Sequence, residues 1–165
     1  MAASAFKRVG KDRYRVRLSP QEVEVLRGLP AQLRAVLDAD EPDPVTERLF
    51  PTAYRQPEDR ERQQEYRRLV QDELLAGKLA NLEMVAATLD RGELRQRRWT
   101  VELTEEEALA WLGVLNDLRL ALGVRLEITE DFDGVVAPDD PEAPAKHLLS
   151  YLGWLEEHLV EALSA

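Results

Sequence analysis

The sequence contains no cysteine and only two histidines, His147 and His158. Without a thiol, the chain can form no disulfide, no thiolate metal site and no cysteine redox switch. The two histidines lie eleven positions apart in a segment with helical periodicity, which puts them on one helix face but about 16 Å apart. That separation is too long for both imidazoles to bind one metal ion, so we predict no metal site.

Motifs of common cofactor and catalytic sites are also missing. The sequence has no glycine-rich phosphate loop, no Gly-x-Ser-x-Gly motif and no Ser-His-Asp spacing. The acidic run at 105–107 falls in the first turn of a predicted helix, where carboxylates complement the helix dipole. We therefore expect a protein that is not an enzyme and binds no cofactor. An enzyme of a type that the sequence does not reveal is the least favoured alternative.

No apolar run approaches the roughly 20 residues that are needed to span a bilayer. The N-terminal stretch MAASAFKRVGKDR lacks the apolar core of a signal peptide, so we expect a cytoplasmic protein that does not associate with a membrane. The 165 residues are 44% hydrophobic and 33% charged, which is typical of a globular chain. We expect a single domain over residues 1–165.

The net charge of −10 is unevenly distributed along the chain. Residues 1–17 carry six basic side chains and one acid, which gives +5, whereas residues 99–165 carry 15 acids and three bases, which gives −12. An acidic body repels phosphate, and this argues against general polyanion binding. A local basic patch near the N-terminus remains compatible with the distribution.

The N-terminal segment predicts a β-hairpin followed by a helix. In AFKRVGKDRYRVRL, two extended runs flank the turn sequence GKD. Ser19 then has the properties of an N-cap, and Glu22 stands where it completes a capping box. Because Pro30 in the following helix has no amide proton, we expect the helix to kink or break there.

The middle of the chain predicts a long connection and a long helix. Asp43 is expected to cap a short helix that runs through Leu49, and the apolar residues up to Tyr54 should pack against the body. Between 57 and 91, apolar residues recur at intervals of three and four, as in a helix. Gly77 marks a point where this helix is expected to bend or split.

A second segment repeats the N-terminal pattern. RRWTVELTEEEALAWLG aligns without a gap on DRYRVRLSPQEVEVLRG at an offset of 99 − 14 = 85, with Thr104 as N-cap and Glu107 completing a capping box. The match extends over 14–37 and 99–122 and includes a glycine and a Leu-Arg pair that capping does not require. We hypothesise an internal strand–helix duplication, and independent convergence of two capped helices is the alternative.

The remaining segments complete the predicted fold. VRLEI after the second helix is either a short strand or the last helical turn, residues 129–143 form an acidic linker, and a last helix runs from about Pro144 to Leu163. A lone hairpin is marginal in water, so the strand near 99–103 should join it. The predicted class is mainly α, with a small antiparallel or mixed β-sheet covered by helices on one face.

Alternation along the predicted strands directs several basic side chains away from the core. The candidate binding patch consists of Arg13, Arg15, Arg17 and Arg98. A solvated strand face without a ligand is one interpretation. Direct DNA binding by this basic ribbon, in the manner of strand readers of the major groove, is another.

The last predicted helix carries an apolar stripe that is wider than one core-facing seam requires. The candidate partner or dimer surface consists of Leu148, Tyr151, Leu152, Trp154, Leu155 and Leu159. Deep burial of this helix in the core and a groove for a partner or a second copy are equally compatible with the pattern.

Four segments together resemble the AosR-like family of actinobacterial domains of unknown function: RLFPTAY, EYRRLVQDELLAGKLANLEMV, WTVELTEEEALAWLGVLNDLRLALGVRLEI and YLGWLEEHLVEAL. The similarity spans essentially the whole chain. It implies a non-enzymatic regulator of transcription in oxidative stress, which acts on a protein partner such as a transcription factor or an RNA polymerase component, or on DNA. The redox form of that role relies on a cysteine pair, so thiol sensing is not implied for this chain.

Overall fold

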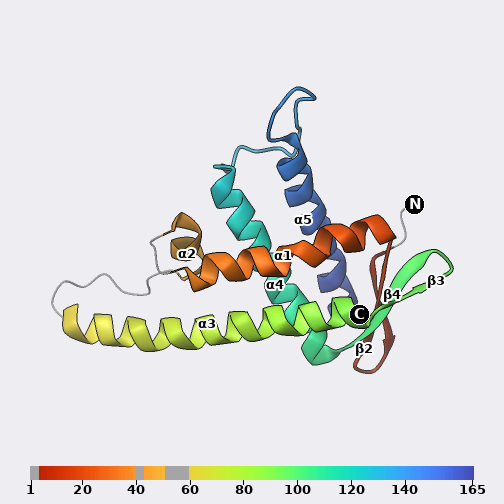
Figure 1. Cartoon of the computed structure of the whole chain (residues 1–165), viewed down its shortest axis with the longest axis horizontal. Helices are drawn as coiled ribbons and strands as arrows, with labels where there is room; N and C mark the ends of the chain where they lie inside the picture. The colour runs from red at the N-terminus through yellow and green to blue at the C-terminus, as the bar shows by residue number, and fades with distance from the viewer. Residues whose placement is uncertain (1–3, 40–42, 51–59) are drawn as a thin grey trace.

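The computed structural model of the chain describes residues 4–39, 43–50 and 60–165, and these residues form a helical body with one small sheet (Figure 1). The elements, in chain order, are β1 (Phe6–Gly10), β2 (Arg13–Leu18), α1 (Pro20–Asp38), α2 (Pro44–Leu49), α3 (Arg60–Arg91), β3 (Glu93–Arg95), β4 (Arg98–Thr104), α4 (Glu105–Arg125) and α5 (Ala143–Ser164). The predicted class, mainly α with a small sheet, is confirmed, and the sheet is antiparallel.

The sheet has the strand order β1-β2-β4-β3, with every neighbouring pair antiparallel. β4 joins the N-terminal hairpin through β2, as expected for the strand near 99–103. Alternation buries one face of these two strands: Tyr14, Val16 and Leu18 of β2 are at most 3% exposed. This buried face belongs to the same apolar core as the helices, so the opposite face of the sheet is open.

A fourth strand, β3, was not expected from the sequence. It pairs with β4 across a two-residue turn in which Gln96 and Arg97 have φ angles of 50° and 66°. Such positive φ values normally require glycine, asparagine or aspartate, and the turn contains none of them. The hairpin therefore carries no turn signal in its sequence.

Two expected interruptions are absent from the described helices. α1 is continuous through Pro30, although the proline removes one backbone hydrogen bond. Pro30 is buried beside Leu26 and Trp111, and this packing offsets the lost bond. α3 likewise continues through Gly77 without splitting.

Other expectations for the helices are confirmed. Asp43 caps α2 by accepting a hydrogen bond from the amide of Val45, and Leu49 and Phe50 are buried. Tyr54 lies outside the described residues. α5 has nearly the bounds expected for the last helix, and the VRLEI segment forms the end of α4 rather than a strand.

Helix α4 is the centre of the body, since it packs against each of the four other helices. Its Trp111 is 1% exposed, and the indole Nε1 donates to Thr88 Oγ1 of α3 over 2.8 Å. The Thr88 hydroxyl in turn donates to the carbonyl of Val85 over 2.7 Å. These bonds satisfy the polar groups that the core encloses here.

A second polar link between α3 and α4 is a charged pair. Lys78 Nζ lies 2.9 Å and 3.0 Å from the two carboxylate oxygens of Asp117, and the side chains are only 19% and 9% exposed. Burial raises the pKa of Asp117, although Lys78 opposes this effect. Lys78 also lies 5.8 Å from the ring centroid of Phe50, which follows α2. The pair therefore joins three helical segments at one point.

Within the described residues, no helix is long and apolar enough to cross a membrane.

Candidate binding site on the open face of the sheet

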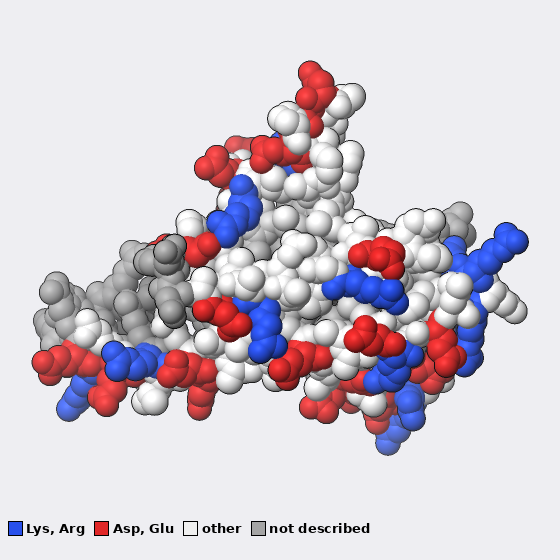
Figure 2. All heavy atoms as spheres, viewed as in Figure 1, with Lys and Arg blue, Asp and Glu red and all other residues white. Residues whose placement is uncertain are grey.

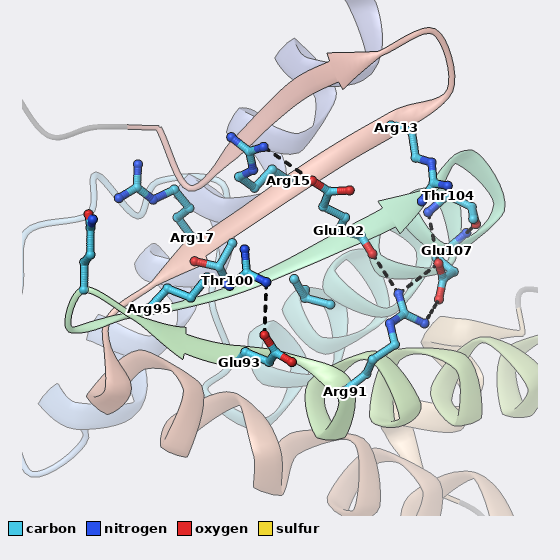
Figure 3. Close-up of a pocket in the computed structure, with 12 residues that line it drawn as sticks. Arg13, Arg15, Arg17, Arg91, Glu93, Arg95, Thr100, Glu102, Thr104 and Glu107 are labelled. Atoms are coloured by element: carbon cyan, nitrogen blue, oxygen red, sulfur yellow. Dashed lines mark hydrogen bonds and ion pairs between the residues drawn. The ribbon is translucent and has the colours of Figure 1, made fainter.

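The open face of the sheet carries the arginines of the predicted patch. Arg13, Arg15 and Arg17 alternate with the buried residues of β2, and their side chains lie on the face away from the helices (Figure 3). The register places them opposite Thr104, Glu102 and Thr100 of β4, respectively. Directly opposite residues of an antiparallel pair share a face, so these side chains are neighbours.

Arg98 lies at the margin of this group. It is exposed, has the same strand parity as Thr100 and is paired with Arg95 of β3. It does not line the hollow that the other three arginines border. The structure thus brings three of the four predicted arginines together and places the fourth beside them.

The hollow on the open face has a volume of about 780 Å³. We call it the β4 groove, because the outward residues of β4 form its floor: Thr100, Glu102 and Thr104. Arg13, Arg15 and Arg17 of β2 form one wall. The other wall consists of Arg91, at the end of α3, and Glu93 and Arg95 of β3.

Arg91 fixes the second wall in place. Its Nη1 lies 2.6 Å from Glu107 Oε2 and its Nη2 lies 3.1 Å from Glu107 Oε1, which is a two-pronged contact. Nη2 also donates to the backbone carbonyl of Glu102 over 2.8 Å. Because β3 pairs only with residues 98–100 of β4, Arg91 binds the edge of β4 that β3 leaves uncovered.

The same contact shifts both ionisation equilibria. The hydrogen bond from Arg91 holds the pKa of Glu107 below its usual range, and the hydrogen bond to Glu107 raises the pKa of Arg91. Sequence reasoning did not identify Arg91 as part of the site. Its strand-facing role depends on the end of α3 reaching the sheet, and the only local signal was that a cap glutamate, Glu107, could accept a second donor.

The arginines of the β4 groove differ in how far their charge is neutralised. Arg15 pairs with Glu102 over 3.3 Å and Arg95 pairs with Glu93 over 3.1 Å. Among the described residues, Arg13 and Arg17 form no ion pair. The open positive charges therefore stand at the two ends of the β2 wall, about 13 Å apart for four residues of strand.

The charge of the whole surface is segregated in the same way. Figure 2 shows lysine and arginine side chains gathered at the end of the molecule where the sheet lies, while acidic side chains dominate the projection formed by the α4–α5 connection. The connection contains six acids, at positions 130, 131, 133, 139, 140 and 142. The open face is therefore a cationic region on an acidic protein.

The second predicted surface, on α5, is largely interior. Leu152, Leu155 and Leu159 are 0% exposed and belong to the core. The others, Leu148, Tyr151 and Trp154, are half-buried.

The half-buried aromatic side chains of α5 already have partners within the chain. The Tyr151 hydroxyl donates to the Glu22 carboxylate at the start of α1, and burial, reinforced by that contact, raises its pKa. The Trp154 ring stacks on Tyr151 and lies 4.2 Å from the ring of His158. Burial of α5 in the body thus accounts for most of its wide apolar stripe.

The described residues contain no group of three or more histidine, cysteine, aspartate or glutamate side chains that could hold a metal ion. The ionisable side chains that line the β4 groove are arginines and glutamates. Such a lining suits recognition of carboxylates or other anions.

Comparison with known proteins gives the family. The model of the domain of unknown function DUF2017 matches residues 3–163. A Mycobacterium leprae protein named "Putative oxidative stress regulator AosR" is 34% identical over 164 residues, which cover 87% of this chain and 67% of that protein. Proteins of Mycobacterium tuberculosis and Mycobacterium bovis named "Oxidative stress regulator AosR" are 29% identical over 186 residues, covering 92% of this chain and 82% of theirs. No solved structure matches. The match over nearly the whole chain shows that the protein belongs to the DUF2017 family, to which the AosR-like resemblance of its sequence had pointed.

Proposed function

We propose that this chain is a stress-response regulatory protein that acts by binding a protein partner through the β4 groove. The names of its mycobacterial relatives support a regulatory role in oxidative stress. The partner that we propose is a component of transcription, such as a transcription factor or an RNA polymerase subunit. The observation that carries the binding role is the pair of unneutralised arginines, Arg13 and Arg17, on an open sheet face of an otherwise acidic protein.

The carboxylates of the groove favour a protein over DNA as the ligand. Duplex DNA presents one negative charge per roughly 1.7 Å of its axis, so a bound duplex would place phosphates along the whole groove. Glu93, Glu102 and Glu107 line the groove and would repel such a continuous row. A protein offers separate carboxylates, which can meet the free arginines and avoid the glutamates.

Direct DNA binding is the second candidate, and one observation favours it. Lys7 pairs with Arg15 in the β1–β2 register, and Arg98 extends the same face at the opposite side. The cationic surface is therefore wider than the groove itself. This wider surface would serve phosphate contacts if the glutamates were avoided.

The groove geometry supports binding rather than catalysis. Its arginines are paired with glutamates or are free, and the hydroxyl of Thr104 accepts the Glu107 amide hydrogen bond of the capping box. These groups hold and attract charge, and none of them forms a nucleophile–base pair within the described lining. We therefore propose a non-enzymatic role.

The proposal can be tested in the native host. A strain that lacks the gene would be complemented with the wild-type chain, with the Arg13→Gln/Arg17→Gln double variant or with the control Arg68→Gln. Arg68 is an exposed arginine of α3, about 35 Å along the helix from Arg91. We expect the transcript response to peroxide to be restored by the wild type and the control and to be lost with the double variant, at equal protein levels.

Full restoration of the response by the double variant would contradict a role for the groove. The ligand class is decided by promoter DNA from the responding genes in a mobility-shift titration against salt. Each arginine that contacts phosphate contributes about 0.9 to the logarithmic salt slope. A slope that falls by about 1.8 in the double variant would establish DNA binding in place of the protein partner.

A further inference from the structure

We propose that the β4 groove holds an extended acidic segment of the partner, in which two carboxylates four residues apart bind Arg13 and Arg17. This inference rests on the proposed function, because it names the kind of partner that the same groove receives.

The spacing of the free arginines sets the spacing of the carboxylates. Arg13 and Arg17 lie on one face of one strand with a single outward residue between them, so their Cα atoms are about 13 Å apart. An extended segment advances by the same distance in four residues and presents residues i and i+4 on one face. An α-helix would need about nine residues to span that distance, and its body is 10–12 Å wide.

The middle of the groove specifies what lies between the two carboxylates. Arg15 stands between the free arginines, and Glu102, 3.3 Å away, neutralises its charge. An acid at position i+2 of the segment would approach Glu102, and a base there would approach Arg15. The groove therefore selects an uncharged residue at i+2, flanked by acids at i and i+4.

The groove floor leaves room for this segment at both ends. Thr104 lies opposite Arg13 and Thr100 lies opposite Arg17, so each free guanidinium faces a short polar side chain. The seven residues of β4 extend over about 23 Å, which is longer than a five-residue extended segment. Arg91 holds the far wall through Glu107 and the Glu102 carbonyl before any ligand arrives, and such preorganisation lowers the cost of binding.

The acidic connection of a second copy is a poor match for the groove. Its acids at positions 130, 131, 133, 139, 140 and 142 include no two that are four residues apart. The pattern that the groove selects is therefore absent from the most acidic segment of this chain. The occupant that we infer is accordingly a segment of a different protein.

Fluorescence anisotropy with synthetic peptides and the full chain tests the spacing. The first peptide is an uncharged threonine–valine segment with glutamates four residues apart. The control peptide has the same composition with glutamates three residues apart, so that in an extended chain they point to opposite faces. We expect the control peptide to bind about tenfold more weakly at low ionic strength, since it loses one charge-assisted contact.

Variants of the protein test the contacts. Arg13→Gln and Arg17→Gln should each weaken the first peptide by about tenfold and leave the control Arg68→Gln unchanged. The Arg13→Glu/Arg17→Glu variant should reject the glutamate peptide and bind a peptide with lysines four residues apart. Thermal unfolding of each variant verifies that the exposed substitutions leave the fold intact.

Several outcomes would overturn the inference. Equal affinity for the two spacings would show unspecific charge attraction, and tighter binding of single-stranded or duplex DNA would show a nucleic-acid site. Self-association of the wild type in sedimentation velocity that the double variant lacks would show that a second copy occupies the groove. Failure of every peptide, together with loss of the peroxide response in the double variant, would reject the extended segment and leave the proposed function standing.

Discussion

The β2–α1 unit and the β4–α4 unit contain the same local structure but use it differently. In both, a strand runs directly into a capping box: Ser19 with Glu22 at the start of α1, and Thr104 with Glu107 at the start of α4. In the first unit, Glu22 also accepts a hydrogen bond from the hydroxyl of Tyr151. In the second, Glu107 is held by the guanidinium of Arg91.

This difference separates what local sequence determines from what tertiary structure adds. A hydroxyl residue and a glutamate three positions later are sufficient to form either cap. The third partner comes from a distant helix, α5 for Glu22 and α3 for Glu107. The first cap thereby anchors a helix within the body, whereas the second becomes part of the wall of the β4 groove.

The sheet register relates the two units further. Tyr14 pairs with Leu103 and Leu18 pairs with Trp99, and at the offset of 85 each pair is the equivalent of the other. The turn-flanking pairs Gly10–Arg13 and Arg95–Arg98 are related by the same offset. This register is the one that a duplication with a local two-fold axis at Val16 and Val101 would produce. The duplication itself stays a prediction.

The largest expected difference between the units concerns a buried charge. Asp117 of α4 is 6% exposed, whereas the equivalent position of α1, Gln32, is exposed. Asp117→Asn leaves Lys78 in a buried site without its counter-charge, and we expect a loss of about 3 kcal/mol in the free energy of unfolding. Gln32→Ala should change it by less than about 0.5 kcal/mol. Urea denaturation measures both values.

A second variant verifies the cause of that loss. Replacing both members of the pair, as in Lys78→Met/Asp117→Leu, removes the charges together and should recover most of the stability. A cost of Asp117→Asn below about 1 kcal/mol would show that Lys78 finds water or another partner, and would remove this difference between the units.

The two caps should be equal in stability and unequal in binding. Ser19→Ala and Thr104→Ala each remove the side-chain acceptor of a capping box and should each lower the free energy of unfolding by about 1 kcal/mol. Only Thr104→Ala alters the floor of the groove and the setting of Glu107, so only this variant should weaken the acidic peptide. Peptide affinities that are equal in the two variants would separate the second cap from the site.

The smallest expected effect is a contrast in pH dependence. The pKa of Tyr151 is raised in the folded state, so its contribution to stability is present below the unfolded value of about 10 and is lost as the pH rises. The pKa of Glu107 is lowered, so its contribution is present above the unfolded value of 4.5 and is lost as the pH falls. The first cap therefore weakens in base and the second weakens in acid.

Melting curves of two variants against the wild type isolate these contributions. Tyr151→Phe should approach the wild type above pH 10, and Arg91→Gln should approach it below pH 4.5. Because Arg91 is about half exposed, we expect differences below about 1 kcal/mol, or roughly 3 °C in Tm. Parallel curves over the whole pH range would contradict the assignment of the two contacts.

Local features of the fold were predictable from the sequence, because they depend on residues a few positions apart. The hairpin, both capping boxes and the bounds of α5 follow from alternation, turn residues and helical periodicity. β3 was not predictable, since Gln96 and Arg97 give no turn signal. Continuity of α1 through Pro30 depends on tertiary packing that a local rule does not include.

The candidate site was predictable only in part, for the same reason. Strand parity put Arg13, Arg15 and Arg17 on one face, and this placement holds. Arg91 enters the groove only because a helix of 32 residues ends beside β4. The neutralisation of Arg15 by Glu102 depends on the β2–β4 register, which the sequence pattern did not specify.

The paired register has a consequence for how a bound segment is oriented. The backbone hydrogen-bonding pattern of β2 and β4 is the same from either end, but the charges are not. Arg15 faces Glu102, whereas Arg17, in the equivalent pair, faces Thr100 and has Arg98 close to it in the register. One end of the groove is therefore more positive than the other. A segment with unequal acidity at its two ends would bind in one direction, and the protein would distinguish that sequence from its reverse.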